Sequence, residues 1–386
     1  MQQDNNISRL EKFHHKKRIK RIKQVCIIIA ILIFVSIFVY TDLGNAFFTF
    51  ISDTSETIEL NLNKGDGFPV DNIIENYIQS EELSNSIAVL DSQKLLIVSP
   101  SGAILNTTPH TYAVPRITVS DKRLCLYNQG GKNMIIKSRQ KHIAEKSFEQ
   151  PIYFAQYSNN GNLAVVTKNE KFKANLTVFA SGFEELFTFK LADDYPLNLS
   201  VAKDNKTIAL GCISSDNGLL KSTTYILNIT NEDITTVEYS GEIPIYSRFL
   251  TNERLLVCFE NNACVYNYVT GVTESAYSYP DKLIGISKDN SLNTVFLFGH
   301  DKQLQRNVMV LLDDNLKEIT KQYLNFMPSN ASITEGNIYV YSKEKLISYD
   351  LTTFNKEEIP LDNNILDLVC AKDIFVVDNK KINILK

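Results

Sequence analysis

The segment NLAVVT (Asn162–Thr167) decides the fold, because its pattern recurs along the chain. A polar residue precedes a nearly unbroken apolar run, which is typical of strands that are covered on both faces. Successive copies start 36 to 47 residues apart. The other seven copies are SIAVLD (Ser86–Asp91), RLCLYN (Arg123–Asn128), TIALGC (Thr207–Cys212), RLLVCF (Arg254–Phe259), TVFLFG (Thr294–Gly299), NIYVYS (Asn337–Ser342) and DIFVVD (Asp373–Asp378).

Each copy lies inside a larger unit. FAQYSNNG precedes Asn162 and indicates a short strand followed by a polar turn, whereas NLTVFA after it indicates a third strand. A more polar fourth strand completes most units. Four antiparallel strands in about 41 residues make one blade of a β-propeller. The sequence therefore predicts an all-β, eight-bladed β-propeller.

Proline positions give an independent count of the blades. Proline cannot donate to a strand ladder and is confined to strand starts and edges. Eight of the ten prolines fall where the fourth strand of one unit should connect to the first strand of the next, namely Pro69, Pro115, Pro151, Pro196, Pro244, Pro280, Pro328 and Pro360. Two unrelated residue classes thus agree on eight repeats.

The last unit ends after its third strand, KINILK, whereas an extra strand, TIELNLN (Thr57–Asn63), precedes the first unit. Because a ring with a missing strand would expose sheet edges, we expect Thr57–Asn63 to complete the eighth blade. A seven-bladed ring with a degenerate end is the alternative. We assign residues 57–386 to the propeller and residues 44–56 to a linker.

The net charge of -4 divides unevenly along the chain. Residues 1–23 carry a charge of +6, residues 24–41 carry none, and residues 42–386 carry -10. The uncharged stretch QVCIIIAILIFVSIFVYT would span roughly 27 Å as a helix, close to the roughly 30 Å hydrocarbon core of a bilayer. It predicts a single transmembrane helix at residues 24–43, with the basic tail of residues 1–23 inside the cell.

The N-terminal sequence has two other interpretations. Gly44 and Ala46 form a small-x-small site, as in a cleaved signal peptide, but the apolar stretch is longer than the usual 7–15 residues. The run HHKKRIKRIK (His14–Lys23) could bind nucleic acid, but beside a membrane span such a run more often fixes topology and contacts anionic lipid. The -10 charge of the remainder also disfavours nucleic acid as a partner.

Three segments carry a resemblance to a known family: GGKNMIIKS (Gly130–Ser138), NNGNLAVVT (Asn159–Thr167) and SSDNGLLKS (Ser214–Ser222). They resemble a family of Gram-positive bacterial proteins that is known only as a domain of unknown function. The resemblance implies a basic tail, one span and an outward-facing propeller related to WD-repeat and quinoprotein-type propellers. It implies a cell-surface location, and it contributes no catalytic residues because none are assigned for the family.

The sequence lacks the common signatures of catalysis and metal binding. The five histidines never pair at i,i+4, and no Cys-x-x-Cys, EF-hand, Gly-x-Ser-x-Gly or phosphate-loop pattern occurs. The chain has no tryptophan, which disfavours the docking motifs of quinoprotein dehydrogenases and Trp-based sugar binding. We therefore predict no cofactor, no metal and no catalytic residues.

Aromatic and basic residues recur beside the junction prolines. In a propeller, these junctions share one face around the channel, and Tyr and Arg are enriched in binding hot spots. The alternative is that the rings plug the channel or pack on the prolines. The predicted partner-binding rim consists of Tyr112, Arg116, Tyr153, Tyr195, Tyr246, Arg248, Tyr279 and Lys282.

One disulfide can be considered, between Cys258 and Cys264 in the hairpin LLVCFENNACVYNY. A three-residue loop, Glu260–Asn262, would set the two cysteines opposite each other, whereas a two-residue loop would separate them onto different faces. The other interpretation of the cysteines is that they are buried and reduced.

These features favour a membrane-anchored, extracytoplasmic β-propeller that acts as a non-enzymatic protein-binding or peptide-binding scaffold. Its predicted location is the cell membrane, as a single-pass protein with the bulk of the chain outside. The alternative is a cell-surface polysaccharide hydrolase or lyase with acids from several blades around the channel, because paired carboxylates can come from distant blades. A cell-wall polymer is a further candidate partner.

Overall fold

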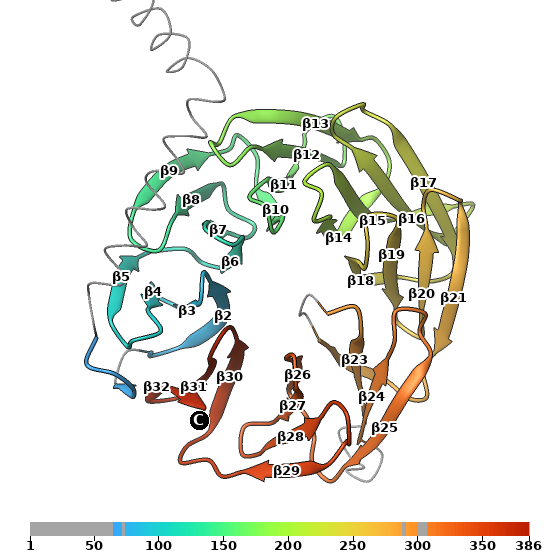
Figure 1. Cartoon of the computed structure of the whole chain (residues 1–386). Coiled ribbons are helices and arrows are strands. Elements are labelled where there is room, and N and C mark those ends of the chain that lie inside the picture. The colour runs from blue at the N-terminus through green and yellow to red at the C-terminus, as the bar shows by residue number, and fades with distance from the viewer. Residues whose placement is uncertain (1–64, 72–73, 288–290, 300–306, 386) are drawn as a thin grey trace, which may run out of the picture. The chain divides into compact units, whose positions relative to one another are not determined.

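The computed structural model describes residues 65–71, 74–287, 291–299 and 307–385. These residues form eight four-stranded antiparallel sheets, which follow one another as blades around a ring (Figure 1). Within those ranges, no helix is long and apolar enough to span a membrane. The predicted tail, transmembrane helix and linker, at residues 1–23, 24–43 and 44–56, lie outside the described residues.

Blades are numbered 1 to 8 in chain order, and the first strand of each lies innermost in the ring (Figure 1). The innermost strands are β2 (Tyr77–Leu83), β6 (Pro115–Val119), β10 (Ile152–Tyr157), β14 (Tyr195–Val201), β18 (Pro244–Phe249), β22 (Leu283–Ile286), β26 (Asn330–Ile333) and β30 (Ile365–Cys370). The second strands are β3 (Ser86–Asp91), β7 (Leu124–Asn128), β11 (Leu163–Lys168), β15 (Thr207–Asp216), β19 (Arg254–Phe259), β23 (Thr294–Phe298), β27 (Asn337–Tyr341) and β31 (Ile374–Asp378).

The outer half of each blade consists of a third and an outermost strand. The third strands are β4 (Lys94–Val98), β8 (Asn133–Lys137), β12 (Ala174–Phe179), β16 (Leu219–Asn228), β20 (Asn262–Asn267), β24 (Asn307–Leu312), β28 (Leu346–Asp350) and β32 (Lys381–Leu385). The outermost strands are β5 (Ile104–Pro109), β9 (His142–Ser147), β13 (Glu185–Leu191), β17 (Ile234–Ser240), β21 (Val272–Ser278), β25 (Glu318–Leu324), β29 (Lys356–Ile359) and, in blade 8, β1 (Val70–Asp71).

The recurring apolar segment forms the second strand of every blade, which confirms the eight-bladed prediction over the seven-bladed alternative. In β3, every residue from Ser86 to Asp91 is buried, as expected for a strand that is covered on both faces. The outermost strands instead alternate, because one face packs inward and the other meets solvent. In β17, exposed and half-buried residues follow one another over its whole length.

The core of the molecule lies between blades rather than inside any one of them. Eight apolar clusters occur, and each joins residues of two neighbouring blades. The cluster that joins blade 8 to blade 1 contains Phe375 and Ile382 on one side and Ile87 and Val89 on the other. Because this cluster closes the ring, each blade, as far as the structure describes it, packs an apolar cluster on both of its faces.

Blade 8 is completed by the N-terminal part of the propeller. The two-residue strand β1 pairs antiparallel with β32, with Val70 opposite Ile382 and Asp71 opposite Lys381. The predicted closing strand, Thr57–Asn63, lies outside the described residues. Pro69 precedes this closing strand, whereas the prediction placed it at a junction between blades.

A carboxylate on the innermost ring also fastens the last blade to the first. Asp367 on β30 accepts a hydrogen bond from the Tyr77 hydroxyl of β2 and another from the Ser80 hydroxyl at 2.6 Å. Its second oxygen accepts the Tyr341 hydroxyl of blade 7 at 2.5 Å. Burial and the neighbouring carboxylate raise the pKa of Tyr77, so both tyrosines remain hydroxyl donors at neutral pH. Asp367 therefore connects three blades.

Amide side chains make similar connections elsewhere on the innermost ring. Gln79 of β2 donates to the carbonyl of Ile117 on β6 at 2.9 Å and accepts its N–H at 3.1 Å. Asn198 of β14 donates to the Pro244 carbonyl of β18 at 2.8 Å and accepts the Ser247 hydroxyl at 2.7 Å. These bonds set the spacing of neighbouring innermost strands.

Replacing Phe375 by alanine should destabilise the propeller by about 3–5 kcal/mol, because a large ring is removed from the closing cluster. Thermal and denaturant unfolding of the full chain would measure the loss. The control is Tyr323→Ala on β25, an aromatic residue that is 69% exposed and should tolerate truncation. Equal unfolding midpoints for the two variants would contradict the role of this cluster.

Candidate partner-binding face

One end of the sheets carries all the connections between blades. Neighbouring strands are antiparallel, so this end also carries the turns between the second and third strands of each blade. We call it the junction face. The opposite end, the turn face, carries the turns between first and second strands and between third and fourth strands.

The predicted rim residues lie at or near the junction face, at the start of innermost strands or in the preceding connections. Four of the tyrosines are half-buried against the apolar clusters between blades, namely Tyr112, Tyr153, Tyr246 and Tyr279. The ring of Tyr279 lies 5.3 Å from that of Phe298, and burial raises the pKa of Tyr279. These four rings serve mainly to pack neighbouring blades together.

Arg248 differs from the prediction. It lies further along β18 and is buried, and its Nη2 donates to the Thr294 hydroxyl of blade 6 at 2.6 Å. The strand alternation turns its side chain into the interface between blades 5 and 6. Arg248 is therefore not presented to a partner.

Three predicted rim residues are exposed, namely Arg116, Tyr195 and Lys282. Arg116 donates through Nε to Gln129 at 3.1 Å. The Tyr195 side chain is 51% exposed, and the Lys173 ammonium donates to its hydroxyl at 3.1 Å and lies 4.7 Å from the ring centroid. Lys173 thus holds the exposed ring of Tyr195 in a fixed orientation and places a positive charge beside it.

Two exposed apolar residues that sequence reasoning missed lie on the innermost strands of blades 4 and 5. Leu197 on β14 is 40% exposed, and Ile245 on the neighbouring innermost strand β18 is 44% exposed. Both follow junction prolines, and each lies at a register shift between the first and second strands of its blade. We call the three exposed residues Tyr195, Leu197 and Ile245, on the neighbouring innermost strands of blades 4 and 5, the junction patch.

The hairpin of β15 and β16 is longer than the described hairpins of second and third strands in the other blades. Each strand has ten residues, whereas the second strands of the other blades have five or six. Asn217 and Gly218 form its turn with φ values of 50° and 81°, as the Asn-Gly pair of a type I′ turn requires. Leu219, at the tip, is 74% exposed. The Asn-Gly pair was the sequence signal that could have identified this hairpin.

Asp194 lies at the base of the same hairpin. It is buried, and its carboxylate accepts the Tyr225 hydroxyl at 2.6 Å. Burial and this bond raise the pKa of Tyr225. Asp194 thus anchors the connection into blade 4 and holds a negative charge beneath the hairpin.

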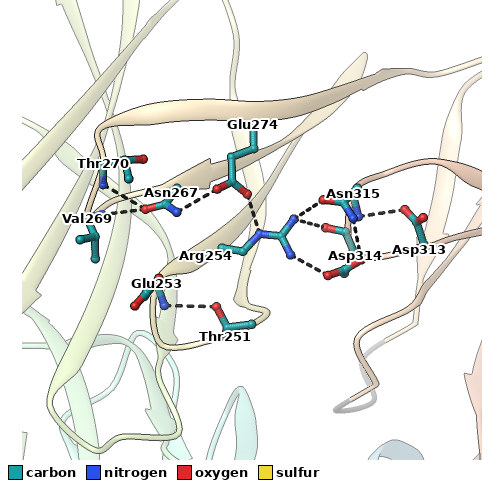
Figure 2. Close-up of polar contacts among 10 residues, drawn as sticks. All are labelled: Thr251, Glu253, Arg254, Asn267, Val269, Thr270, Glu274, Asp313, Asp314 and Asn315. Carbon is teal, nitrogen blue, oxygen red and sulfur yellow. Dashed lines mark hydrogen bonds and ion pairs between the residues drawn. The ribbon is translucent and has the colours of Figure 1, made fainter.

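The turn face carries a network around Arg254 (Figure 2). The guanidinium donates to Glu274 at 2.6 Å and to Asp314 Oδ2 at 2.6 Å. Its Nη2 also donates to the Asp314 carbonyl and to Asn315 Oδ1, both at 2.7 Å. Asn267 donates to Glu274 at 2.8 Å. Because these groups satisfy one another and join blades 5 and 6, the network is a structural clamp.

The cysteine hairpin adopts a register that separates the two predicted partners. A two-residue turn, Glu260-Asn261, sets Cys258 opposite Ala263 and Cys264 opposite Val257. Cys258 packs against blade 6 and Cys264 against blade 4, on opposite faces of the sheet. Both thiols are free, so the structure does not form the disulfide that was considered.

No group of three or more histidine, cysteine or acidic side chains gathers to hold a metal ion within the described ranges. Asp367, one of the carboxylates on the innermost strands, accepts hydrogen bonds from hydroxyl groups of blades 1 and 7. The junction face exposes aromatic, apolar and basic side chains, among them Tyr195, Ile245 and Arg116.

Fold and site define the chain as an eight-bladed β-propeller with an exposed patch on its junction face. It belongs to a family of unknown function, DUF5711, whose sequence profile matches residues 69–386. This confirms the resemblance to a family of unknown function. A search of curated proteins finds no match.

Solved structures of other propellers are similar in fold. Sqt1 of Saccharomyces cerevisiae has a TM-score of 0.61 at 10% identity, covering 84% of this chain and 100% of that one. Apo AztD of Citrobacter koseri has a TM-score of 0.59 at 12% identity, covering 76% and 88%. BamB of Moraxella catarrhalis has a TM-score of 0.53 at 9% identity, covering 83% and 98%. At these identities, the likeness shows the fold alone.

Cys258 and Cys264 should remain reduced in the folded protein. Burial raises the pKa of the Cys264 thiol to about 11 and that of Cys258 further, so both should resist alkylation near pH 8 until the chain unfolds. Intact-mass measurement with and without reductant, and alkylation before and after denaturation, would check this. A non-reduced mass lower by two hydrogens, mapped to this hairpin, would contradict the register.

Replacing Arg254 by methionine should lower the Tm at pH 7 by about 2–4 °C, because two carboxylates lose their shared cation. The hydrogen bonds from Asn267 and Arg254 lower the pKa of Glu274, so its contribution is present above the ordinary glutamate pKa. That contribution is lost as the pH falls through the lowered value. The Tm difference should therefore shrink below about pH 4.

The control for this series is Lys343→Met, which removes an exposed cation from the β27–β28 turn. Its Tm should match that of the wild type across the same pH range. A difference between Arg254→Met and wild type that stays constant from pH 7 to pH 3 would assign the effect to packing.

Proposed function

We propose that this protein is a membrane-anchored, extracytoplasmic β-propeller that binds a protein or peptide partner through its junction face, without catalysing a reaction. The observation that carries the proposal is the junction patch. Tyr195, Leu197 and Ile245 lie 40–51% exposed on two neighbouring innermost strands. The other four predicted rim tyrosines are packed into the interfaces between blades.

A patch of this composition is suited to protein recognition. An aromatic ring and two branched aliphatic side chains provide rigid apolar area, and such residues dominate the binding energy of interfaces. Lys173, which lies over the Tyr195 ring, orients it and adds a polar margin. An apolar centre bounded by polar groups is the usual anatomy of a protein interface.

The location rests on the N-terminal sequence. Eighteen uncharged residues follow a tail of charge +6, and the residues that follow carry -10. Positive residues favour the cytoplasmic side of a span, so the propeller is assigned to the outer side. The charge of -10 on residues 42–386 separately disfavours nucleic acid as the partner.

The polysaccharide hydrolase remains the alternative function, because no observation favours it. That activity would need carboxylates free to act on a substrate, but Asp367 on the innermost ring accepts hydrogen bonds from Tyr77, Ser80 and Tyr341. These hydrogen bonds give Asp367 a structural role in connecting blades 7, 8 and 1. Binding of a cell-wall polymer through Tyr195 would use the same patch as a protein partner.

The double variant Tyr195→Ala/Ile245→Ser should lose the partner. Intact cells of the source organism would be treated with a membrane-impermeant crosslinker, and the tagged full chain would then be purified. Wild type should yield a crosslinked protein adduct that the double variant lacks. Ile319→Ser/Tyr323→Ala, on the exposed side of β25, removes side chains of similar type and should retain the adduct.

The outcomes separate the two parts of the proposal. An adduct of equal yield in wild type and Tyr195→Ala/Ile245→Ser would contradict the junction patch as the binding surface. Wild type that reacts only after the cells are permeabilised would contradict the extracytoplasmic location. The double variant's Tm, measured beside that of wild type, checks that the fold is retained.

A further inference from the structure

We propose that the β15–β16 hairpin binds its partner by strand addition, and that the added segment is an extended, basic stretch of a partner protein. This inference rests on the proposed function and specifies the class of partner. It concerns the part of the hairpin that rises above the body of blade 4. The occupant follows from backbone geometry, local charge and exposed apolar area.

The upper part of β15 lacks a neighbour on its inner side. The pairing of β14 with β15 begins with Tyr195 opposite Ile213, whereas β15 continues to Asp216. Residues Ser214 to Asp216 therefore pair with β16 on one side and have no strand partner on the other, among the residues described. An unpaired strand edge is a template for another strand.

The ladder shows which backbone groups are free at this edge. Gly241 donates its N–H to the Leu220 carbonyl at 3.0 Å, so the backbone polar groups of Leu220 face away from β15. Ser215 is directly opposite Leu220. In an antiparallel pair of strands, two opposite residues either bond to each other through both N–H and C=O groups, or both point these groups away from the pair. The N–H and C=O of Ser215 therefore point to the unpaired inner edge.

The charge beside this edge is negative. Lys221 forms an ion pair with Glu238 at 2.6 Å. The hydrogen bond to Glu238, and then the charges of Glu238, Asp194 and Asp216, raise the pKa of Lys221. Asp216 stays exposed at the tip. The complementary side chain on an incoming strand is a lysine or arginine.

Exposed apolar area next to the unpaired edge indicates that the added partner segment also carries apolar residues. Leu219 lies directly opposite Asp216, so their side chains share one face of the hairpin. A strand added at Ser215 presents alternate residues to that face. A basic residue near Asp216 combined with apolar residues that reach Leu219 or the junction patch fits this surface.

The experiment uses the tagged full chain in detergent micelles and a phage-displayed library of random ten-residue peptides as the probe. Selected peptides should be rich in lysine or arginine alternating with apolar residues. The tightest binder, made synthetically, is then measured against Ser215→Pro, which removes the free edge N–H. Because that N–H does not bond to β16, the hairpin should stay folded.

Ser215→Pro should weaken binding of the selected peptide about tenfold or more, since an edge hydrogen bond is lost and the added strand is obstructed. Ser215→Ala keeps the backbone and should change the affinity by less than about twofold. Asp216→Asn should weaken binding and reduce its dependence on salt concentration. The Tm of each variant checks that the propeller is intact.

Three results would overturn the inference: no selected binder, selected peptides without basic residues, or equal affinity for wild type and Ser215→Pro. The crosslinking experiment on intact cells separates this failure from that of the proposed function. Loss of the adduct in Tyr195→Ala/Ile245→Ser but not in Ser215→Pro would retain the proposed function and remove the hairpin. An adduct unaffected by either variant would remove both.

Discussion

The structure depends on one constraint: every blade must have both faces covered by its neighbours. Each of the eight apolar clusters takes residues from two blades, so no blade holds a core of its own. A single sheet with two apolar faces would be unstable in water, and an open array would leave two such faces exposed. Closure between blades 8 and 1, through Phe375 and Asp367, therefore stabilises all eight blades together.

The same constraint explains how much of the fold could be predicted from sequence. Burial on both faces produces nearly unbroken apolar runs, so the second strands could be located almost to the residue, as with SIAVLD and β3 (Ser86–Asp91). The closing strand could not be located in this way. Val70–Asp71 is two residues long and has no periodicity, and its identity depends on a partner, β32, at the other end of the chain.

The candidate site was predictable in position but not in detail. Junction prolines indicated where the chain enters each blade, and Tyr195 is indeed exposed there. Tyr246 and Arg248, which both lie on β18, instead point into the interface between blades 5 and 6. There, blade 6 supplies apolar rings and the Thr294 hydroxyl. A shift of one residue in register likewise decides whether Cys258 and Cys264 meet. Such choices depend on contacts between segments that the local pattern does not encode.

The upper part of the β15–β16 hairpin has a strand edge that no other described strand covers. The charges next to this edge explain why the edge does not lead to self-association. An unpaired edge invites pairing with a second copy of the same chain. In such a pair, the carboxylates of Asp194 and Asp216 in one copy would approach those of the other, with each Lys221 already bound to Glu238. Like charges at an edge oppose self-association, whereas they attract a basic strand. The negative charge that opposes pairing between two copies of this edge therefore also favours a basic partner strand.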